Sequence, residues 1–222
     1  MPAPFDILVT GGTGYIGTHL VPKLLGRGHR VRILARADSI TRVSGGATPV
    51  LGNPLDVQSV QAALRQGETV IHLVGTPHPN PSKAEQFEKV DLVSIKATVT
   101  AAKNVGIRHL IYVSVAQPAP VMRAFLWVRT LGETMIGEAG LTATIVRPWY
   151  VLGPGHRWPT LLKPLYKFAE LVPATRATAE RLGLVTIDEM VAALVRAVEQ
   201  PPLPGQRRLV EVPDIKRALV QK

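Results

Sequence analysis

The fold is decided by residues 6–17, D-I-L-V-T-G-G-T-G-Y-I-G, in which a short apolar run leads into spaced glycines. The apolar residues predict a strand, and the glycines predict a tight turn into a helix over Tyr15–Leu25. Gly11 and Gly14 let the backbone turn sharply and approach a pyrophosphate, while Gly17 lets the helix pack closely against the sheet. Free N–H groups at the helix start then face the phosphates, so this stretch predicts a bound dinucleotide.

Composition limits the class of protein. The chain has 222 residues, no cysteine and a net charge of +10, which suits one α/β domain without disulfides. Lys and Arg outnumber Asp and Glu by 12 to 7 in residues 1–121 and by 14 to 9 in the remainder. This even surplus argues against a nucleic-acid patch. No window reaches the ~18 apolar residues of a membrane span, and the N-terminus lacks a signal core. We therefore expect a cytoplasmic protein without a transmembrane segment.

Strand and helix patterns alternate along the whole chain. The predicted strands are 6–10, 31–35, 49–51, 69–73, 109–114, 142–146 and 208–212. The predicted helices are 15–25, 56–65, 84–104, 121–137 and 188–199, and Thr186 with Glu189 forms a capping-box pattern before the last. We expect an α/β fold of one domain, residues 1–222: a doubly wound, mostly parallel Rossmann sheet with helices on both faces and a small C-terminal lid. Pro22 should kink or loosen the first helix.

The second predicted strand bears on the choice of cofactor. NAD-selective folds usually carry Asp or Glu about 20 residues after the glycines, where it binds the ribose 2′-hydroxyl. Here the strand ends in Ala35 and Arg36, and no carboxylate occurs until Asp38. A guanidinium pairs well with a 2′-phosphate, so we expect NADP(H) to be preferred over NAD(H). The alternative is that Arg36 is a solvated loop residue.

Several segments resemble one superfamily. They are T-G-G-T-G-Y-I-G at 10–17, G-N-P-L-D at 52–56, G-I-R-H-L-I-Y-V-S at 106–114, T-I-V-R-P at 144–148, G-P-G at 153–155 and V-T-I-D-E-M at 185–190. Together they resemble the short-chain dehydrogenase/reductase superfamily, in its extended and atypical branch with NmrA-like and complex-I-subunit-like proteins. The resemblance covers almost the whole chain.

The resemblance implies a set of cofactor contacts. The loop residues implied are Gly11, Thr13, Gly14, Tyr15, Ile16 and Gly17. Asn53 stands where the family usually has Asp and implies an adenine contact, Val74 and Gly75 imply a cofactor wall, and Ser114 and Pro148 imply nicotinamide contacts. The family often pairs through the helices beside the fifth strand, so the resemblance also allows a homodimer or another protein partner.

The catalytic pattern of the family is missing. Classical members use a Tyr with a Lys four residues later, and no tyrosine here has a Lys at that distance. Alignment on Gly132–Glu133 puts Phe125 and Arg129 at the two positions. Phe125 has no proton to give, and Arg129 is a poor acid that could hold ribose hydroxyls or a substrate carboxylate. The alternative reading is a packing residue and a surface cation. Ser114 matches the family's active-site Ser and could donate a hydrogen bond.

Other candidate residues are weaker. His78 and His156 lie in loops predicted beside the cleft and could act as acids, although ordinary loop residues are the simpler reading. No histidine has the spacing of a metal ligand, so no metal is expected. Residues 147–176 mix aromatic and basic side chains, and we expect residues 148–185 to form a lid over the substrate. That mixture suits a flat or acidic ligand, a membrane-surface or partner-binding face, or a self-packed subdomain.

Three functions remain open from the sequence. The first is an NADP(H)-dependent oxidoreductase without the Tyr–Lys pair, acting on an unknown small substrate such as a quinone or flavin that carries its own electron sink. The second is a non-catalytic NADP(H) sensor. The third is an assembly or scaffold protein with a structural cofactor.

Overall fold

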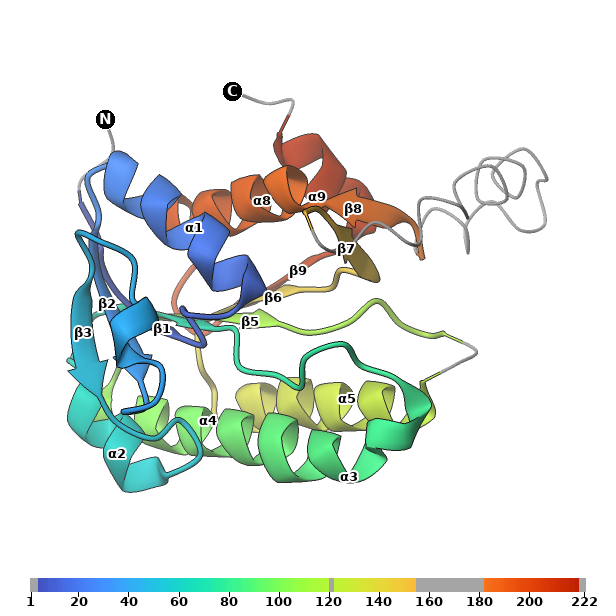
Figure 1. Cartoon of the computed structure of the whole chain (residues 1–222), viewed down its shortest axis with the longest axis horizontal. Helices are drawn as coiled ribbons and strands as arrows, with labels where there is room; N and C mark the ends of the chain where they lie inside the picture. Colours follow the sequence, from blue (N-terminus) through green and yellow to red (C-terminus); the bar gives the residue numbers. More distant parts are fainter. Residues whose placement is uncertain (1–3, 120–121, 155–181, 220–222) are drawn as a thin grey trace.

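A computed structural model describes residues 4–119, 122–154 and 182–219, and its main feature is a parallel sheet (Figure 1). The strands are β1 (Asp6–Thr10), β2 (Arg30–Ala35), β3 (Thr48–Leu51), β4 (Thr69–His72), β5 (His109–Val113), β6 (Ala143–Val146) and β9 (Arg207–Val210). Their order is β3-β2-β1-β4-β5-β6-β9, and every pairing is parallel. The predicted doubly wound Rossmann sheet is confirmed.

Helices cover both faces of this sheet (Figure 1). One layer contains α1 (Tyr15–Gly26), α8 (Ile187–Glu199) and α9 (Val212–Ala218). The other contains α2 (Val57–Ala63), α3 (Ala84–Gln86), α4 (Val93–Val105) and α5 (Arg123–Glu138). Short 3₁₀ turns, η1 (Ile40–Arg42) and η2 (Pro81–Lys83), lie in connecting segments. Within the described ranges, no helix is long and apolar enough to cross a membrane.

The strand sequences explain the two layers. Successive residues of a strand point to opposite faces, so a buried parallel strand is apolar throughout. In β1, Ile7 and Val9 belong to the core beneath α1 and α8, while Leu8 belongs to the core beneath α2 and α4. All three are fully buried. The sheet is thus held from both sides, and its carboxyl edge carries the loops that form the site.

The structure corrects several predicted boundaries. The helix predicted over residues 84–104 contains a π-helical segment, η3 (Phe87–Leu92), between α3 and α4. The last strand ends at Val210, and Val212 begins α9 instead of ending the strand. The prediction also missed a small parallel sheet of β7 (Tyr150–Leu152) and β8 (Leu184–Thr186). Helix α1 continues through Pro22, and the predicted capping box of Thr186 with Glu189 is present.

Candidate functional site

Glycines shape the loop between β1 and α1. Gly11 has a φ of 75°, and a Cβ there would lie 2.8 Å from the carbonyl carbon of Leu73 and from the amide nitrogen of Val74. A Cβ at Gly17 would collide with the backbone of Gly12. Gly11 therefore lets the loop touch the end of β4. Gly17 permits close contact between the helix and the glycine loop, at Gly12. The sequence analysis had predicted that Gly17 permits close contact between the helix and the sheet.

The start of α1 is left without a side-chain cap. Gly14 occupies the N-cap position, donates from its nitrogen to the oxygen of Gly11 at 3.0 Å, and accepts from the nitrogen of Thr18 at 2.9 Å. No side chain caps the first turn. An uncapped helix N-terminus beside a glycine turn suits phosphate groups, through its N–H groups and its dipole. The residues present therefore fit the pyrophosphate of a dinucleotide.

Two residues predicted to lie on the adenine side are Arg36, which follows β2, and Asn53, which follows β3. In the sheet, β2 is the neighbour of β1, the strand that leads into the glycine loop, and β3 lies beyond β2. The Arg36 side chain is 57% exposed, and its Nη2 lies 3.1 Å from Oδ2 of Asp38. Asn53 is exposed, and its Oδ1 accepts a hydrogen bond from the nitrogen of Leu55 at 3.0 Å. Arg36 is therefore accessible, but it already has a weak carboxylate partner.

The predicted nicotinamide-side residues follow β5 and β6, which are paired. The nitrogen of Ser114 donates to the oxygen of Val146 at 2.8 Å, and the nitrogen of Ala116 donates to the oxygen of Pro148 at 2.9 Å. These backbone bonds extend the strand pairing into the loops. Ser114 and Pro148 are thus brought close to each other at the ends of two paired strands.

Ser114 belongs to a buried polar network centred on Glu133. Its Oγ donates to Oε1 of Glu133 at 2.6 Å, and Nε2 of Gln117 donates to the same oxygen at 3.0 Å. Arg147 pairs with both carboxylate oxygens of Glu133 and also contacts Oε1 of Glu211 at 3.0 Å. A carboxylate paired with a guanidinium accepts hydrogen bonds, so the hydroxyl proton of Ser114 is directed at Glu133. The hydrogen bond that Ser114 could donate, as the sequence suggests, is directed at Glu133 in this structure.

Electrostatics support this arrangement of charges. The hydrogen bond to Glu133 is the largest influence on Arg147 and, together with Glu211, it outweighs partial burial and raises the pKa of Arg147. In the sequence, Glu133 served only to align the chain with the family pattern, and no role was expected for its side chain. Its partner Arg147 lies in the loop that follows β6. Spacing along the chain could not reveal that these two residues form an ion pair.

Arg129 is buried and forms an ion pair. Its Nη2 donates to Oδ1 of Asp91 at 2.5 Å, and its Nη1 donates to the oxygen of Val113 at 3.0 Å. The other carboxylate oxygen of Asp91 accepts from both the nitrogen and the hydroxyl of Thr76. A Cβ at Gly75 would collide with the guanidinium. The alternative of a surface cation is therefore wrong, because Arg129 packs on the loop after β4.

Neighbouring side chains keep Arg129 protonated. Burial lowers the pKa of Arg129, but Tyr112 and Asp91 outweigh that effect and leave the pKa above its ordinary value. The guanidinium carbon lies 5.8 Å from the centre of the Tyr112 ring. Arg129 therefore holds a permanent charge that is already committed to Asp91.

Phe125 packs against other side chains. Its ring centre lies 5.0 Å from that of Phe87 and 5.0 Å from the guanidinium carbon of Arg129. Of the two readings left open by the sequence, these contacts fit the packing residue. The phenyl ring of Phe125 is thus stacked with the paired guanidinium of Arg129.

Tyr15 connects the glycine loop to β7. A Cβ at Gly153 would collide with the Tyr15 hydroxyl and lie 3.0 Å from Cγ2 of Ile187. Burial, followed by the nearby Tyr150 and Asp188, raises the pKa of Tyr15. The phenol therefore stays protonated and packs against Gly153, the residue that follows β7.

His72 is a buried polar residue that the sequence analysis did not single out. Its Nδ1 lies 3.0 Å from the hydroxyl of Thr10 and 3.1 Å from that of Thr98, and its Nε2 lies 3.3 Å from the hydroxyl of Ser94. Burial, assisted by Arg129, lowers the pKa of His72 to about 3. The neutral ring joins β1, β4 and α4 behind the site.

The remaining predicted residues divide between described and undescribed parts of the chain. His78 lies in a loop after β4 with a φ of 49°. His156 and most of the segment 148–185 lie outside the described residues, which omit 155–181. Among the residues that the structure does describe, no group of three or more His, Asp or Glu could hold a metal ion.

Comparison with known proteins places these features in a family. A protein-family profile described as NAD(P)H-binding matches residues 11–160. Ceramide reductase of Caulobacter vibrioides is 28% identical over 216 residues, which cover 95% of this chain and 65% of that protein. The alpha subcomplex subunit 9 of NADH dehydrogenase [ubiquinone] 1 from Arabidopsis thaliana is 26% identical, over 86% of this chain and 49% of that protein. The chain thus spans about half to two thirds of these relatives.

A solved structure supports the same fold. A short-chain dehydrogenase/reductase superfamily protein from Agrobacterium tumefaciens, with bound NAD, superposes with a TM-score of 0.66 at 18% identity. The match covers 92% of this chain and 76% of that chain. The predicted Rossmann architecture is confirmed by this likeness, and membership of an NAD(P)H-binding family by the profile over residues 11–160.

Proposed function

The chain belongs to the NAD(P)H-binding family, and from that premise we propose that it is an NADP(H)-dependent oxidoreductase that works without a tyrosine–lysine pair. The observation that carries the cofactor part is the glycine loop, in which Gly11 leaves no room for a side chain beside the uncapped start of α1. Backbone N–H groups at such a turn bind the pyrophosphate without help from side chains. Named relatives that are reductases support the oxidoreductase part.

The preference for NADP(H) depends on Arg36. Its ion-pair partner Asp38 is 62% exposed, and exposed pairs contribute about 0–1 kcal/mol. A 2′-phosphate can therefore replace Asp38 at little cost and gain a charge-assisted hydrogen bond. After the next strand, β3, the Oδ1 of Asn53 accepts from the nitrogen of Leu55, which leaves the amide NH₂ group to donate to an adenine nitrogen.

The nicotinamide side favours a particular kind of acceptor. A bound nicotinamide supplies a hydride. The chain's own residues offer position and polarity: the Ser114 proton points to Glu133, Phe125 has none to give, and Arg129 is paired with Asp91. A substrate that stabilises the added electrons itself, such as a quinone or a flavin, does not depend on a side-chain acid. We therefore assign a small quinone-like or flavin-like acceptor.

The same geometry favours a second candidate function. With the Ser114 and Arg129 side chains committed to internal partners, the fold can hold NADP(H) without reacting. The bound cofactor then acts as a signal, or as a structural part of an assembly. This reading needs no acceptor, which makes the two functions separable.

A turnover screen tests the proposal. The protein is first shown by thermal shift to bind NADPH, since ligand at 100 times its Kd stabilises a fold by about 2.7 kcal/mol. NADPH oxidation is then followed with quinones, free flavins and small aldehydes. We expect quinones or flavins to be reduced faster than aldehydes. Tight NADPH binding without consumption by any acceptor would reject the enzyme and support the sensor or scaffold.

A further inference from the structure

The first residues of the seven strands lie together at one edge of the main sheet. All pairings are parallel, so this edge is opposite the carboxyl edge, which carries the glycine loop. Backbone hydrogen bonds join its segments: the nitrogen of Arg30 donates to the oxygen of Phe5 at 3.0 Å, and that of Arg108 to the oxygen of Glu68 at 2.9 Å. The amino edge is defined as residues 4–6, 27–30, 43–48, 64–69, 106–109, 139–143 and 200–208, which lead into and begin the strands.

The charge of the amino edge is strongly positive. Six arginines occur with one aspartate and one glutamate, which gives a formal charge of +4: Arg27, Arg30, Arg65, Arg108, Arg207 and Arg208, with Asp6 and Glu68. Arginine stays charged at every physiological pH. The positive surplus is even along the sequence, but the parallel fold gathers this part of it at one edge.

Ion pairs neutralise part of this charge. Three pairs occur at the amino edge: Asp6 with Arg30, Glu68 with Arg32 of β2, and Glu199 of α8 with Arg27. Each pair uses one arginine. Within the described ranges, no carboxylate lies at ion-pair distance from the other four arginines: Arg65, Arg108, Arg207 and Arg208.

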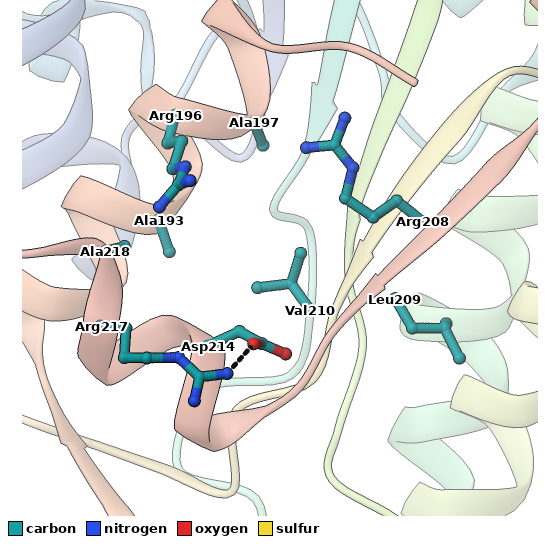
Figure 2. A pocket seen from close by; sticks show the side chains of 9 residues that line it. All are labelled: Ala193, Arg196, Ala197, Arg208, Leu209, Val210, Asp214, Arg217 and Ala218. Atoms are coloured by element: carbon teal, nitrogen blue, oxygen red, sulfur yellow. Dashed lines mark hydrogen bonds and ion pairs between the residues drawn. The ribbon is translucent and has the colours of Figure 1, made fainter. Parts of the chain in front are cut away.

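Neutral groups contact two of these four arginines. The guanidinium carbon of Arg108 lies 4.9 Å from the centre of the Phe5 ring. Figure 2 shows the Arg208 side chain extending from β9 toward α8, where its Nη2 donates to the backbone oxygen of Gln200 at 2.5 Å. That contact uses one of its five N–H groups. The guanidinium groups therefore keep N–H donors for an anionic partner.

An apolar side chain is exposed at the same edge. Leu203 is 67% exposed and lies between two prolines in the segment that leads into β9. This segment is tied to the one that leads into β6, because the nitrogen of Gly205 donates to the hydroxyl oxygen of Thr142 at 2.8 Å. The amino edge thus presents a leucine together with a row of guanidinium groups.

We propose that the amino edge binds the surface of an anionic lipid bilayer. Guanidinium groups bind lipid phosphates well, and each basic residue near an anionic bilayer strengthens binding about fivefold. Leu203 can enter the headgroup region, where burial of its side chain adds to the attraction. A nucleic acid fits this edge less well. It gains little from Leu203, and the described residues of the edge include no exposed aromatic ring on which a base could stack.

This surface is separate from the proposed cofactor site. The strands of the main sheet have 4 to 6 residues. At a rise of about 3.3 Å per residue, the glycine loop therefore lies roughly 13–20 Å from the amino edge. A bilayer bound at the amino edge leaves the glycine loop open, so the inference does not depend on the cofactor.

The first test compares two pairs of exposed arginines. Arg65→Gln with Arg108→Gln removes two charges from the amino edge, and Arg42→Gln with Arg123→Gln removes two exposed charges from η1 and the start of α5. Both double variants have the same net charge. Cosedimentation is measured without nucleotide, using phosphatidylcholine vesicles with and without phosphatidylglycerol. We expect binding to require phosphatidylglycerol, to weaken about 25-fold in the amino-edge variant and to change less than about twofold in the control.

The absence of cysteine allows a second readout that does not depend on loss of binding. Leu203→Cys and Leu51→Cys each introduce one thiol for a polarity-sensitive dye. Leu51 is a matched control, because it is 66% exposed but ends β3 at the carboxyl edge. We expect anionic vesicles to shift the emission of the dye at position 203 to the blue and to leave that at position 51 unchanged.

Nucleic acids are tested as the alternative partner, with labelled duplex DNA and single-stranded RNA. The proposal is overturned if no anionic vesicle binds, or if the two double variants bind vesicles equally well. It is also overturned if the dyes at positions 203 and 51 respond alike. Binding of either nucleic acid that depends on Arg65 and Arg108, without binding of vesicles, would likewise reject a lipid surface.

Discussion

The guanidinium of Arg129 and the carboxylate of Asp91 form a buried ion pair, 2.5 Å between Nη2 and Oδ1. Both side chains are at least nine-tenths buried. Asp91 also accepts two hydrogen bonds from Thr76 in the loop after β4. The pair is therefore part of the framework that holds the loop beside the glycine turn.

Asp91→Asn should strongly destabilise the protein. The substitution leaves the buried Arg129 charge without a counter-charge, and breaking such pairs costs about 3–5 kcal/mol. Asp6→Asn removes a similar partner from Arg30 at the surface and should cost far less, because solvent screens an exposed pair. Urea denaturation of both variants measures the difference, and equal losses would mean that the Arg129 pair contributes no more than a surface pair.

Ser114→Ala should affect stability more than chemistry. The hydroxyl proton is directed at Glu133, so its loss removes one hydrogen bond worth about 0.5–1.5 kcal/mol. Turnover with any acceptor found in the screen should fall less than tenfold, because general acid catalysis typically contributes about 10²–10⁴-fold. A fall of a hundredfold or more, with stability unchanged, would make Ser114 a proton donor.

Gly11→Ala should be worse tolerated than Gly140→Ala. Both positions have positive φ, 75° and 69°, so both variants pay about 1–2 kcal/mol for the backbone conformation. Only at Gly11 does the added Cβ collide with the chain at Leu73, which adds about 1–3 kcal/mol of overpacking. Thermal unfolding should show the larger loss for Gly11→Ala, and NADPH binding should weaken in that variant alone. Equal behaviour would contradict the close contact of loop and β4.

The fold should lose stability below neutral pH because of His72. Its pKa is about 3 in the folded chain and about 6.5 in the unfolded chain, since burial disfavours the charged ring. Below pH 6.5 the unfolded chain therefore binds a proton that the folded chain does not, and stability falls toward pH 3. By pH 5 the loss is about 2 kcal/mol. His72→Gln should flatten the urea-denaturation profile between pH 7 and 5, whereas an unchanged slope would contradict the burial of a neutral ring.

The sheet could be predicted well because the residues that define each strand and turn are close together in the sequence. The run 6–17 contains the strand, the turn and the helix start in one segment, and apolar strands of four to six residues can only be buried. The predicted ends of helices and strands were wrong where contacts beyond the local sequence determine where an element begins or ends. Val212 begins α9 because Glu211 and Asp214 form a capping box, although its apolar character reads as strand.

The site was harder to predict because its partners are distant in the chain. Arg129 and Asp91 are separated by 38 positions, and Ser114 and Glu133 by 19. Pattern and spacing could identify Phe125 and Arg129 as departures from the superfamily. They could not reveal that Arg129 would be buried with a carboxylate from the π-helical segment, since that contact depends on how α5 packs.

We propose that the glycine loop binds NADP(H) and that Arg36 selects it through the 2′-phosphate. A fluorescence titration of NADPH and NADH into the protein and into Arg36→Asp tests it directly. We predict that the native chain binds NADPH at least about tenfold more tightly than NADH, as for loss of a charged hydrogen bond, and that Arg36→Asp abolishes this preference. Equal affinities in the native chain, or the same preference in Arg36→Asp, would contradict the role of Arg36. Absence of binding to either nucleotide would contradict the account as a whole.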